Sequence, residues 1–163
     1  MSMIKVSWIS KVSIMVFAFL LLYGQFSYSS EYEKEVRAAA EEFYTALNAV
    51  FKGDLEPMIE VWSHADDVTY LGPAGGILVG WKEVRNSWEA QAKLKLGGEL
   101  KPKEMEIIAG ESIGITVNYE RGTIYINGKT EEVNIRATNV FRRENGKWKM
   151  VGHHTDILPR LKI

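Results

Sequence analysis

The chain has 163 residues, of which 46% are hydrophobic and 25% are charged, and its formal net charge is −1. These values are typical of one globular domain, and they argue against a nucleic-acid-binding protein, which needs a strongly basic face. The chain has no cysteine. Disulfides, zinc–thiolate sites and a cysteine nucleophile are therefore excluded.

The N-terminal segment has the features of a secretory signal peptide. Lys5 and Lys11 precede an apolar run over 14–22, and small residues follow it. A basic start, a short apolar core and a small-x-small site are the parts of such a signal, and a membrane-spanning helix needs roughly 20 apolar residues. We predict a signal peptide over 1–29, a mature domain over 30–163 and a periplasmic or secreted protein. An uncleaved membrane anchor is the alternative.

The first half of the mature chain predicts three helices and two short strands. Apolar residues recur at spacings of three and four over about 30–52, and shorter helical patterns cover about 54–62 and 81–96. The strands are expected over 68–71 and 77–79. The apolar side chains that form these helical patterns are Val36, Ala40, Phe43, Leu47, Val50, Met58, Ile59, Trp62, Trp81, Val84, Trp88 and Ala92.

From Lys103 onward the apolar residues alternate with a period of two, as in half-buried strands. Asn127-Gly128 and Asn145-Gly146 are strong hairpin signals. Helices that precede an antiparallel meander form an α+β layout. The three long strands are predicted over 111–126, 129–143 and 147–157.

The two hairpin turns decide which side chains share a face. A two-residue turn at Asn127-Gly128 pairs Tyr119 with Arg136, whereas the second turn leaves two registers open. A three-residue loop ending at Gly146 places Arg136 opposite His154, and a two-residue loop places these two residues on opposite faces. We favour the three-residue loop because it makes one continuous apolar face from Ile113, Ile115, Val117, Val140, Trp148 and Met150. A bulge at Gly122 would change the count.

The favoured register gathers Tyr119, Arg136, His154 and Asp156 at one end of this face. An imidazole or carboxylate there could act as a general base, and tyrosine or arginine could stabilise an oxyanion. A plain Arg136–Asp156 ion pair and a hydrogen-bonded core histidine at His154 are the alternatives. The residues expected to line or cover a ligand pocket are Trp62, Tyr70, Trp81, Trp88, Thr138 and Trp148, with an aromatic core as the alternative.

Other site types are not expected. His64, Asp66, Asp67 and His153 have no recognised metal-ligand spacing, so we expect no metal and no cofactor. The glycine-rich segment over 72–76 is not followed by the Gly-Lys-Ser/Thr of a phosphate-binding loop. No serine-nucleophile motif of the G-x-S-x-G kind is present.

Several segments resemble the SnoaL-like proteins of bacteria, within the nuclear transport factor 2-like superfamily. The segment over 62–73 resembles their second helix and first strand, and 80–84 resembles the start of their third helix. The segments over 136–143, 146–151 and 153–156 resemble their closing hairpin. In order along the chain, these motifs cover nearly the whole predicted mature domain.

The resemblance implies a cone, in which a curved antiparallel sheet wraps around three N-terminal helices and leaves a pocket at the open end. Relatives in the superfamily include ketosteroid isomerase, polyketide cyclases and limonene epoxide hydrolase, as well as association domains that assemble through the outer sheet face. The fold alone does not settle the function. Similar sequences often end in His-x-Ser, and Asp156 stands in place of that serine here.

The resulting expectation is an exported protein that binds a small apolar or aromatic molecule, with chemistry of the isomerase, cyclase or hydratase kind left open. The alternative is a homodimerisation module. Its outer sheet face is expected to carry Ile135, Ala137, Phe141 and Val151.

Overall fold

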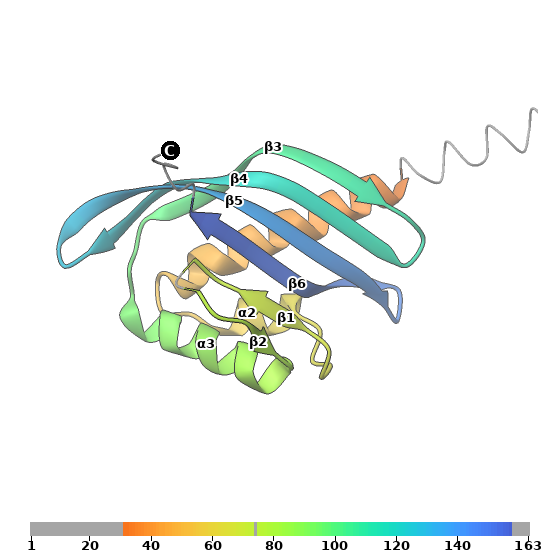
Figure 1. The fold of residues 1–163 in the computed structure, drawn as a ribbon, viewed down its shortest axis with the longest axis horizontal. Coiled ribbons are helices and arrows are strands. Elements are labelled where there is room, and N and C mark those ends of the chain that lie inside the picture. Colours follow the sequence, from red (N-terminus) through yellow and green to blue (C-terminus); the bar gives the residue numbers. More distant parts are fainter. Residues whose placement is uncertain (1–30, 74, 158–163) are drawn as a thin grey trace, which may run out of the picture.

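The computed structural model describes residues 31–73 and 75–157, so the predicted signal peptide over 1–29 lies outside the described residues. Within the described ranges, no helix combines the length and the apolar character that crossing a bilayer requires. A strongly curved sheet of six strands wraps around the helices on its inner side (Figure 1). The predicted α+β fold is confirmed.

Residues 31–50 are helical and cross the inner face of the sheet. The five apolar residues predicted for this stripe are buried, with exposed fractions of 4% or less. At one end Val36 packs against Gly114, where an added Cβ would lie 2.3 Å from a Val36 methyl. Near the other end the Asn48 amide donates to the Leu100 carbonyl (2.9 Å) and accepts from the Leu100 N–H (2.8 Å). These contacts fix the N-terminal helix on the sheet.

The next elements close one side of the structure, in the order α2 (Glu56–Val61), β1 (Thr69–Leu71), β2 (Leu78–Val79) and α3 (Trp81–Leu94). All four were predicted within a few residues. In α3 the side chains of Val84, Trp88 and Ala92 are buried, as their spacing indicates, and Lys95 ends the helix in the left-handed conformation.

The meander contains β3 (Glu99–Ala109), β4 (Ile113–Ile126), β5 (Lys129–Glu144) and β6 (Lys147–Ile157). The last three were predicted and β3 was not. The sheet order is β2-β1-β6-β5-β4-β3, with β1 parallel to β6 and the other pairs antiparallel. Pro102 is tolerated in β3 because β3 is an edge strand, and a bulge interrupts its pairing between Lys103 and Glu106.

The pairing of β4 with β5 is as predicted, with Tyr119 opposite Arg136 and no register shift at Gly122. The favoured three-residue loop between β5 and β6 is wrong. Glu144 pairs with Lys147 across a two-residue turn, in which Asn145 and Gly146 have φ angles of 50° and 79°.

A bulge in β6 then changes which residues face inward. Phe141 pairs with Met150 and Val140 pairs with Gly152, so Val151 is the extra residue. Trp148 and Met150 point inward before the bulge, and His153 and Thr155 point inward after it. Arg136 therefore faces Asp156, and not His154 as predicted.

The predicted apolar face of β4 lies on the outside of the sheet. Ile113 and Val117 are 43% and 42% exposed, whereas their neighbours Thr116, Asn118 and Glu120 are 6% exposed or less. The prediction assumed that the more apolar row of this strand faces the core. The residues that face the helices are instead polar, and they create the site described next.

Candidate functional site

Six buried polar side chains lie together on the inner face of the sheet, and we call them the polar row. β4 contributes Thr116, Asn118 and Glu120, β5 contributes Asn139, and β6 contributes His153 and Thr155. Each is 6% exposed or less. Because buried polar groups are costly unless they are hydrogen-bonded, their partners define the chemistry of this face.

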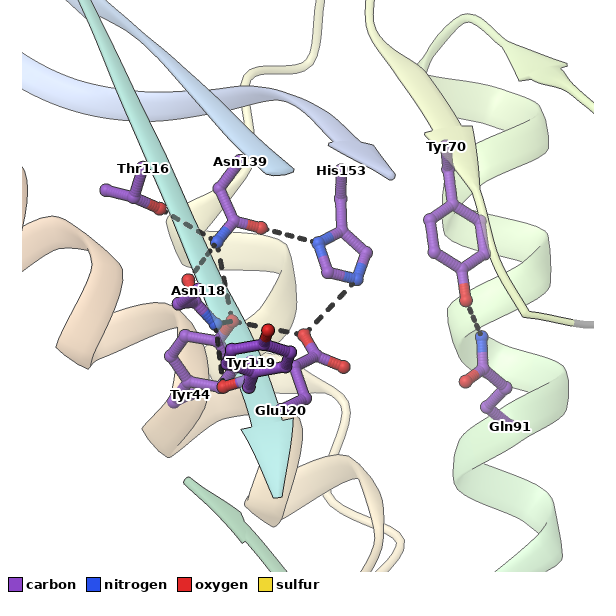
Figure 2. Close-up of polar contacts among 9 residues, drawn as sticks. All are labelled: Tyr44, Tyr70, Gln91, Thr116, Asn118, Tyr119, Glu120, Asn139 and His153. Atoms are coloured by element: carbon purple, nitrogen blue, oxygen red, sulfur yellow. Dashed lines mark hydrogen bonds and ion pairs between the residues drawn. The ribbon is translucent and has the colours of Figure 1, made fainter. Parts of the chain in front are cut away.

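Tyr44 of the N-terminal helix joins the polar row through its hydroxyl (Figure 2). The hydroxyl donates to Oε1 of Glu120 over 3.1 Å and accepts a bond of 2.8 Å from the amide of Asn118. The amide nitrogen of Asn139 donates to the Thr116 hydroxyl over 3.0 Å. The network therefore locks the Glu120 carboxyl and the Asn139 amide in defined orientations.

The orientation of Asn139 sets the tautomer of His153. Since the Asn139 amide nitrogen is directed at Thr116, its oxygen Oδ1 faces the His153 ring, 2.6 Å from Nδ1. In a neutral ring Nδ1 must then carry the proton, which leaves Nε2 as an acceptor. Nε2 lies 3.8 Å from Oε1 of Glu120.

Burial changes the protonation of both members of this Glu120–His153 pair. It raises the pKa of Glu120 to about 7, against the opposing effect of the Tyr44 hydrogen bond. It lowers the pKa of His153 to about 3. Glu120 is thus poised to gain or lose a proton near neutral pH, beside a histidine that stays uncharged.

A cavity of about 380 Å³ lies beside this pair on the inner side of the sheet, and we call it the interior cavity, although it is partly open to solvent. Its walls come from the N-terminal helix, α3 and the inner sheet face, and they include aliphatic side chains such as Leu47, Leu100 and Ile124. Tyr70 of β1 also lines it, and its hydroxyl accepts a hydrogen bond of 3.2 Å from Gln91 of α3 (Figure 2). Burial raises the pKa of Tyr70 to about 12, so its phenol stays neutral. This is the usual form of a small-molecule site, apolar with a few convergent polar groups.

Two polar atoms of the cavity lining lack a hydrogen-bond partner among the described residues. They are the hydroxyl of Thr155 and the indole N–H of Trp88, on side chains that are 4% and 1% exposed. A buried polar atom without a partner costs about 1–3 kcal/mol. Both atoms are sealed from solvent by the side chains around them, so this cost belongs to the packing of the cavity wall.

The four residues predicted to be catalytic lie on the opposite, outer face of the sheet. Tyr119, Arg136, His154 and Asp156 do come together, around an open trough of about 350 Å³. Arg136 donates to Asp156 over 3.0 and 2.5 Å, and these side chains are 57% and 40% exposed. The predicted aromatic cover over this group is wrong, because the helices cover the other face.

The six predicted pocket residues have separate positions. Tyr70 and Trp88 line the interior cavity, whereas Thr138 lines the outer trough. Trp62 is buried in the core, and Trp81 stacks on His64 with ring centroids 4.4 Å apart. Trp148 donates its indole N–H to Glu35 of the N-terminal helix over 2.8 Å.

The sequence interpretation missed Tyr44, Glu120 and Asn139, and it chose His154 where the adjacent His153 faces inward. One signal was available, because Thr116, Asn118 and Glu120 alternate along a strand that needed a buried face. Tyr44 directly follows Phe43 on the buried side of the N-terminal helix, where it reads as an ordinary core aromatic residue.

Comparison with known proteins gives the same fold. The sequence model of the SnoaL-like domain matches residues 36–158. A Streptomyces avermitilis structure, described as a candidate dehydratase of the NTF2-like family, superposes with a TM-score of 0.68 at 22% identity, over 77% of this chain and 96% of that one.

Two further relatives are described by other roles. A structure from Thiobacillus denitrificans, described as a candidate association domain of calcium/calmodulin-dependent protein kinase type II, is 30% identical over 76% of this chain and 94% of that one, with a TM-score of 0.64. The F-box protein SKIP8 of Arabidopsis thaliana is 25% identical over 122 residues, which are 72% of this chain. The match spans 47% of that plant protein, about half its length.

Proposed function

Because the chain belongs to the SnoaL-like domain family, we propose that it binds a small, largely apolar molecule in the interior cavity and acts on it by acid–base chemistry. The observation that carries this proposal is the buried Glu120–His153 pair at the cavity wall, with Nε2 of His153 free to accept a hydrogen bond. A carboxyl group whose pKa is near neutral is suited to general acid–base catalysis.

The residues around the pair have supporting roles in this proposal. Asn139 holds the His153 ring and Tyr44 holds the Glu120 carboxyl, so both are positioning residues. Isomerisation, cyclisation and hydration or dehydration are reactions of this acid–base type. The description of the Streptomyces avermitilis relative as a candidate dehydratase agrees with that class.

We also propose that the protein is exported and acts in the periplasm or outside the cell. The support is the order of basic, apolar and small residues over 1–29. The cavity-lining residues that the structure describes lie between Leu47 and Thr155, outside the predicted signal peptide.

The experiment that tests the binding proposal is native mass spectrometry of the full-length gene product, purified gently after expression in a bacterial host. We expect the mass of a chain that starts near residue 30, with an additional small-molecule mass that is lost on denaturation. Two negative results together would count against the interior cavity as a binding site. The native mass would carry no added small molecule, and no fraction of a host metabolite extract would raise the melting temperature of the protein.

Self-association through the outer sheet face is a second candidate function. Ile108, Ile113 and Val117 are apolar and 72%, 43% and 42% exposed, and Ile108 lies opposite Ile115 on that face. The Thiobacillus denitrificans relative described as a candidate association domain supports it. Three residues predicted for this interface lie instead on the inner side, where Ala137 and Phe141 are buried and Ile135 lines the interior cavity.

If the outer face pairs two copies, Val117→Asp will convert a dimer into a monomer. A charge in the centre of an apolar interface stays unpaired and desolvated, which costs several kcal/mol. Sedimentation velocity at micromolar concentration measures the change. Ile77→Asp is the matched control, because Ile77 is 68% exposed and precedes β2, outside this face. A monomeric wild-type protein would rule out the interface.

A further inference from the structure

The charged side chains among the described residues that line the interior cavity are all acidic. The described residues that line it include two carboxylates, Glu120 and Glu132, and neither lysine nor arginine. His153 also lines it and is neutral, because burial holds its pKa far below the usual range. These carboxyl groups would repel a carboxylate or phosphate ligand, whereas they would attract a cation.

Two hydrogen-bond acceptors belong to neighbouring residues of the cavity lining. They are Nε2 of His153 and the second carboxyl oxygen of Glu120, Oε2. Oε1 already accepts from Tyr44, and Figure 2 shows Oε2 turned away from that bond. The 3.8 Å between Nε2 and Oε1 is too long for a direct hydrogen bond. One donor atom placed between the imidazole and the carboxyl group can reach both.

The walls around these acceptors suit an apolar cation. The Tyr70 ring lies parallel to the His153 ring with centroids 5.7 Å apart, and it lies 4.8 Å from the ring of Trp88. Phe51 and the aliphatic side chains complete the lining. Aromatic faces stabilise an ammonium group by cation–π attraction, and a desolvated contact of this kind contributes about 2 kcal/mol.

We infer that the cavity takes a primary amine on a hydrocarbon skeleton, bound as the ammonium ion, with N–H groups directed at His153 and Glu120. This inference rests on the proposed function, because it names the chemical class of the molecule bound at that same site. A primary ammonium has donors and no acceptor, which matches these two acceptors and the acidic lining.

The amine supplies a positive partner that the described residues do not give to Glu120. The titratable groups near this carboxyl are Tyr44 from the N-terminal helix, Tyr70 from β1 and His153 from β6, and Glu132 of β5 lines the same cavity. None of them is positively charged at neutral pH. Binding of an ammonium ion therefore favours ionised Glu120, and below about pH 7 it must displace the Glu120 proton.

The test compares three ligands with one skeleton: 4-phenylbutylamine, 4-phenylbutan-1-ol and 4-phenylbutanoate. Their affinities are measured by titration calorimetry on the full-length wild-type protein, on Glu120→Gln and on His154→Asn. At about pH 8 we expect the amine to bind wild type at least about 10-fold more tightly than the alcohol, with no detectable binding of the carboxylate. The amine preference is expected to vanish in Glu120→Gln and to persist in His154→Asn, whose altered side chain lies on the outer face.

The same titration at about pH 6 should weaken amine binding by about 10-fold, because Glu120 must then release a proton. Equal affinities of amine and alcohol in wild type would overturn the amine assignment and leave the cavity as a binding site. Tight binding of the carboxylate would overturn it as well. If none of the three ligands binds wild type, the amine inference fails. If the native mass also carries no small molecule, the proposed function fails with it.

Discussion

Glu120→Gln and His153→Asn are expected to change the pH dependence of stability in opposite directions. Relative to wild type, the free energy of unfolding of Glu120→Gln should increase as the pH rises from about 4.5 to about 7. That of His153→Asn should decrease relative to wild type as the pH rises from about 3 to about 6.5. Each difference should change by about 1.4 kcal/mol per pH unit within its window.

The direction follows from the protons that each group binds. Glu120 has a pKa of about 7 when folded and 4.5 in the ordinary case, so between these values only the folded protein holds that proton. Raising the pH then destabilises the wild-type protein, and Gln removes this loss. His153 has a pKa of about 3 when folded and 6.5 in the ordinary case, so between these values only the unfolded chain holds its proton. Raising the pH through that window stabilises the wild-type protein, and Asn removes this gain.

Urea unfolding at several pH values gives both differences, and titrating groups common to the three proteins cancel in the comparison. Within the overlap of the two windows, from about 4.5 to about 6.5, the wild-type contributions of the pair cancel. The folded and the unfolded chain then each hold one proton on these two residues. Difference curves that are flat with pH would show that Glu120 and His153 titrate normally, and the description of the pair would be wrong.

The same two variants should lower the turnover of the cavity ligand by about 10²- to 10⁴-fold, the usual contribution of a general acid or base. His154→Asn is the matched control, since His154 is adjacent in sequence but lines the outer trough. Asp156→Asn is a second control from the same outer face. The measurement is kcat for the molecule identified by native mass spectrometry.

We expect both outer-face controls to keep the kcat of wild type. Equal losses in His154→Asn and in His153→Asn would instead assign the chemistry to the outer trough. If kcat of Glu120→Gln falls only near the melting temperature of the variant and is restored well below it, the loss reflects unfolding. That result would mark Glu120 as a structural residue.

Local patterns predicted most of the fold. The stripe from Val36 to Val50 and the positions of the two Asn-Gly hairpins depend on a few neighbouring residues, and the structure confirms them, although the favoured loop length at the second hairpin is wrong. The edge strand β3 was missed because Pro102 and the bulge near Glu104 interrupt its alternation. The bulge in β6 changes the strand register at the single residue Val151, and the amino acids around Val151 give no signal that predicts a bulge there.

The candidate site was harder to predict, because it depends on which face of the sheet is covered. The outer row of β4 has Ile113, Ile115 and Val117, so it is more apolar than the inner row, and the usual rule selects the wrong face. Exposed apolar residues and buried polar residues on one strand each carry a cost in stability. Functional surfaces are where such departures from the folding rules are expected.

The most direct test of the account is the protonation state of the His153 ring, read from ring-nitrogen NMR of ¹⁵N-histidine-labelled protein. The chain has three histidines, and His153→Asn assigns the signals. We predict a neutral His153 ring with a proton on Nδ1 and none on Nε2 between about pH 5 and about pH 8. An imidazolium ring in that range, or a ring with its proton on Nε2, would contradict the proposal that Nε2 is the free acceptor at the cavity wall.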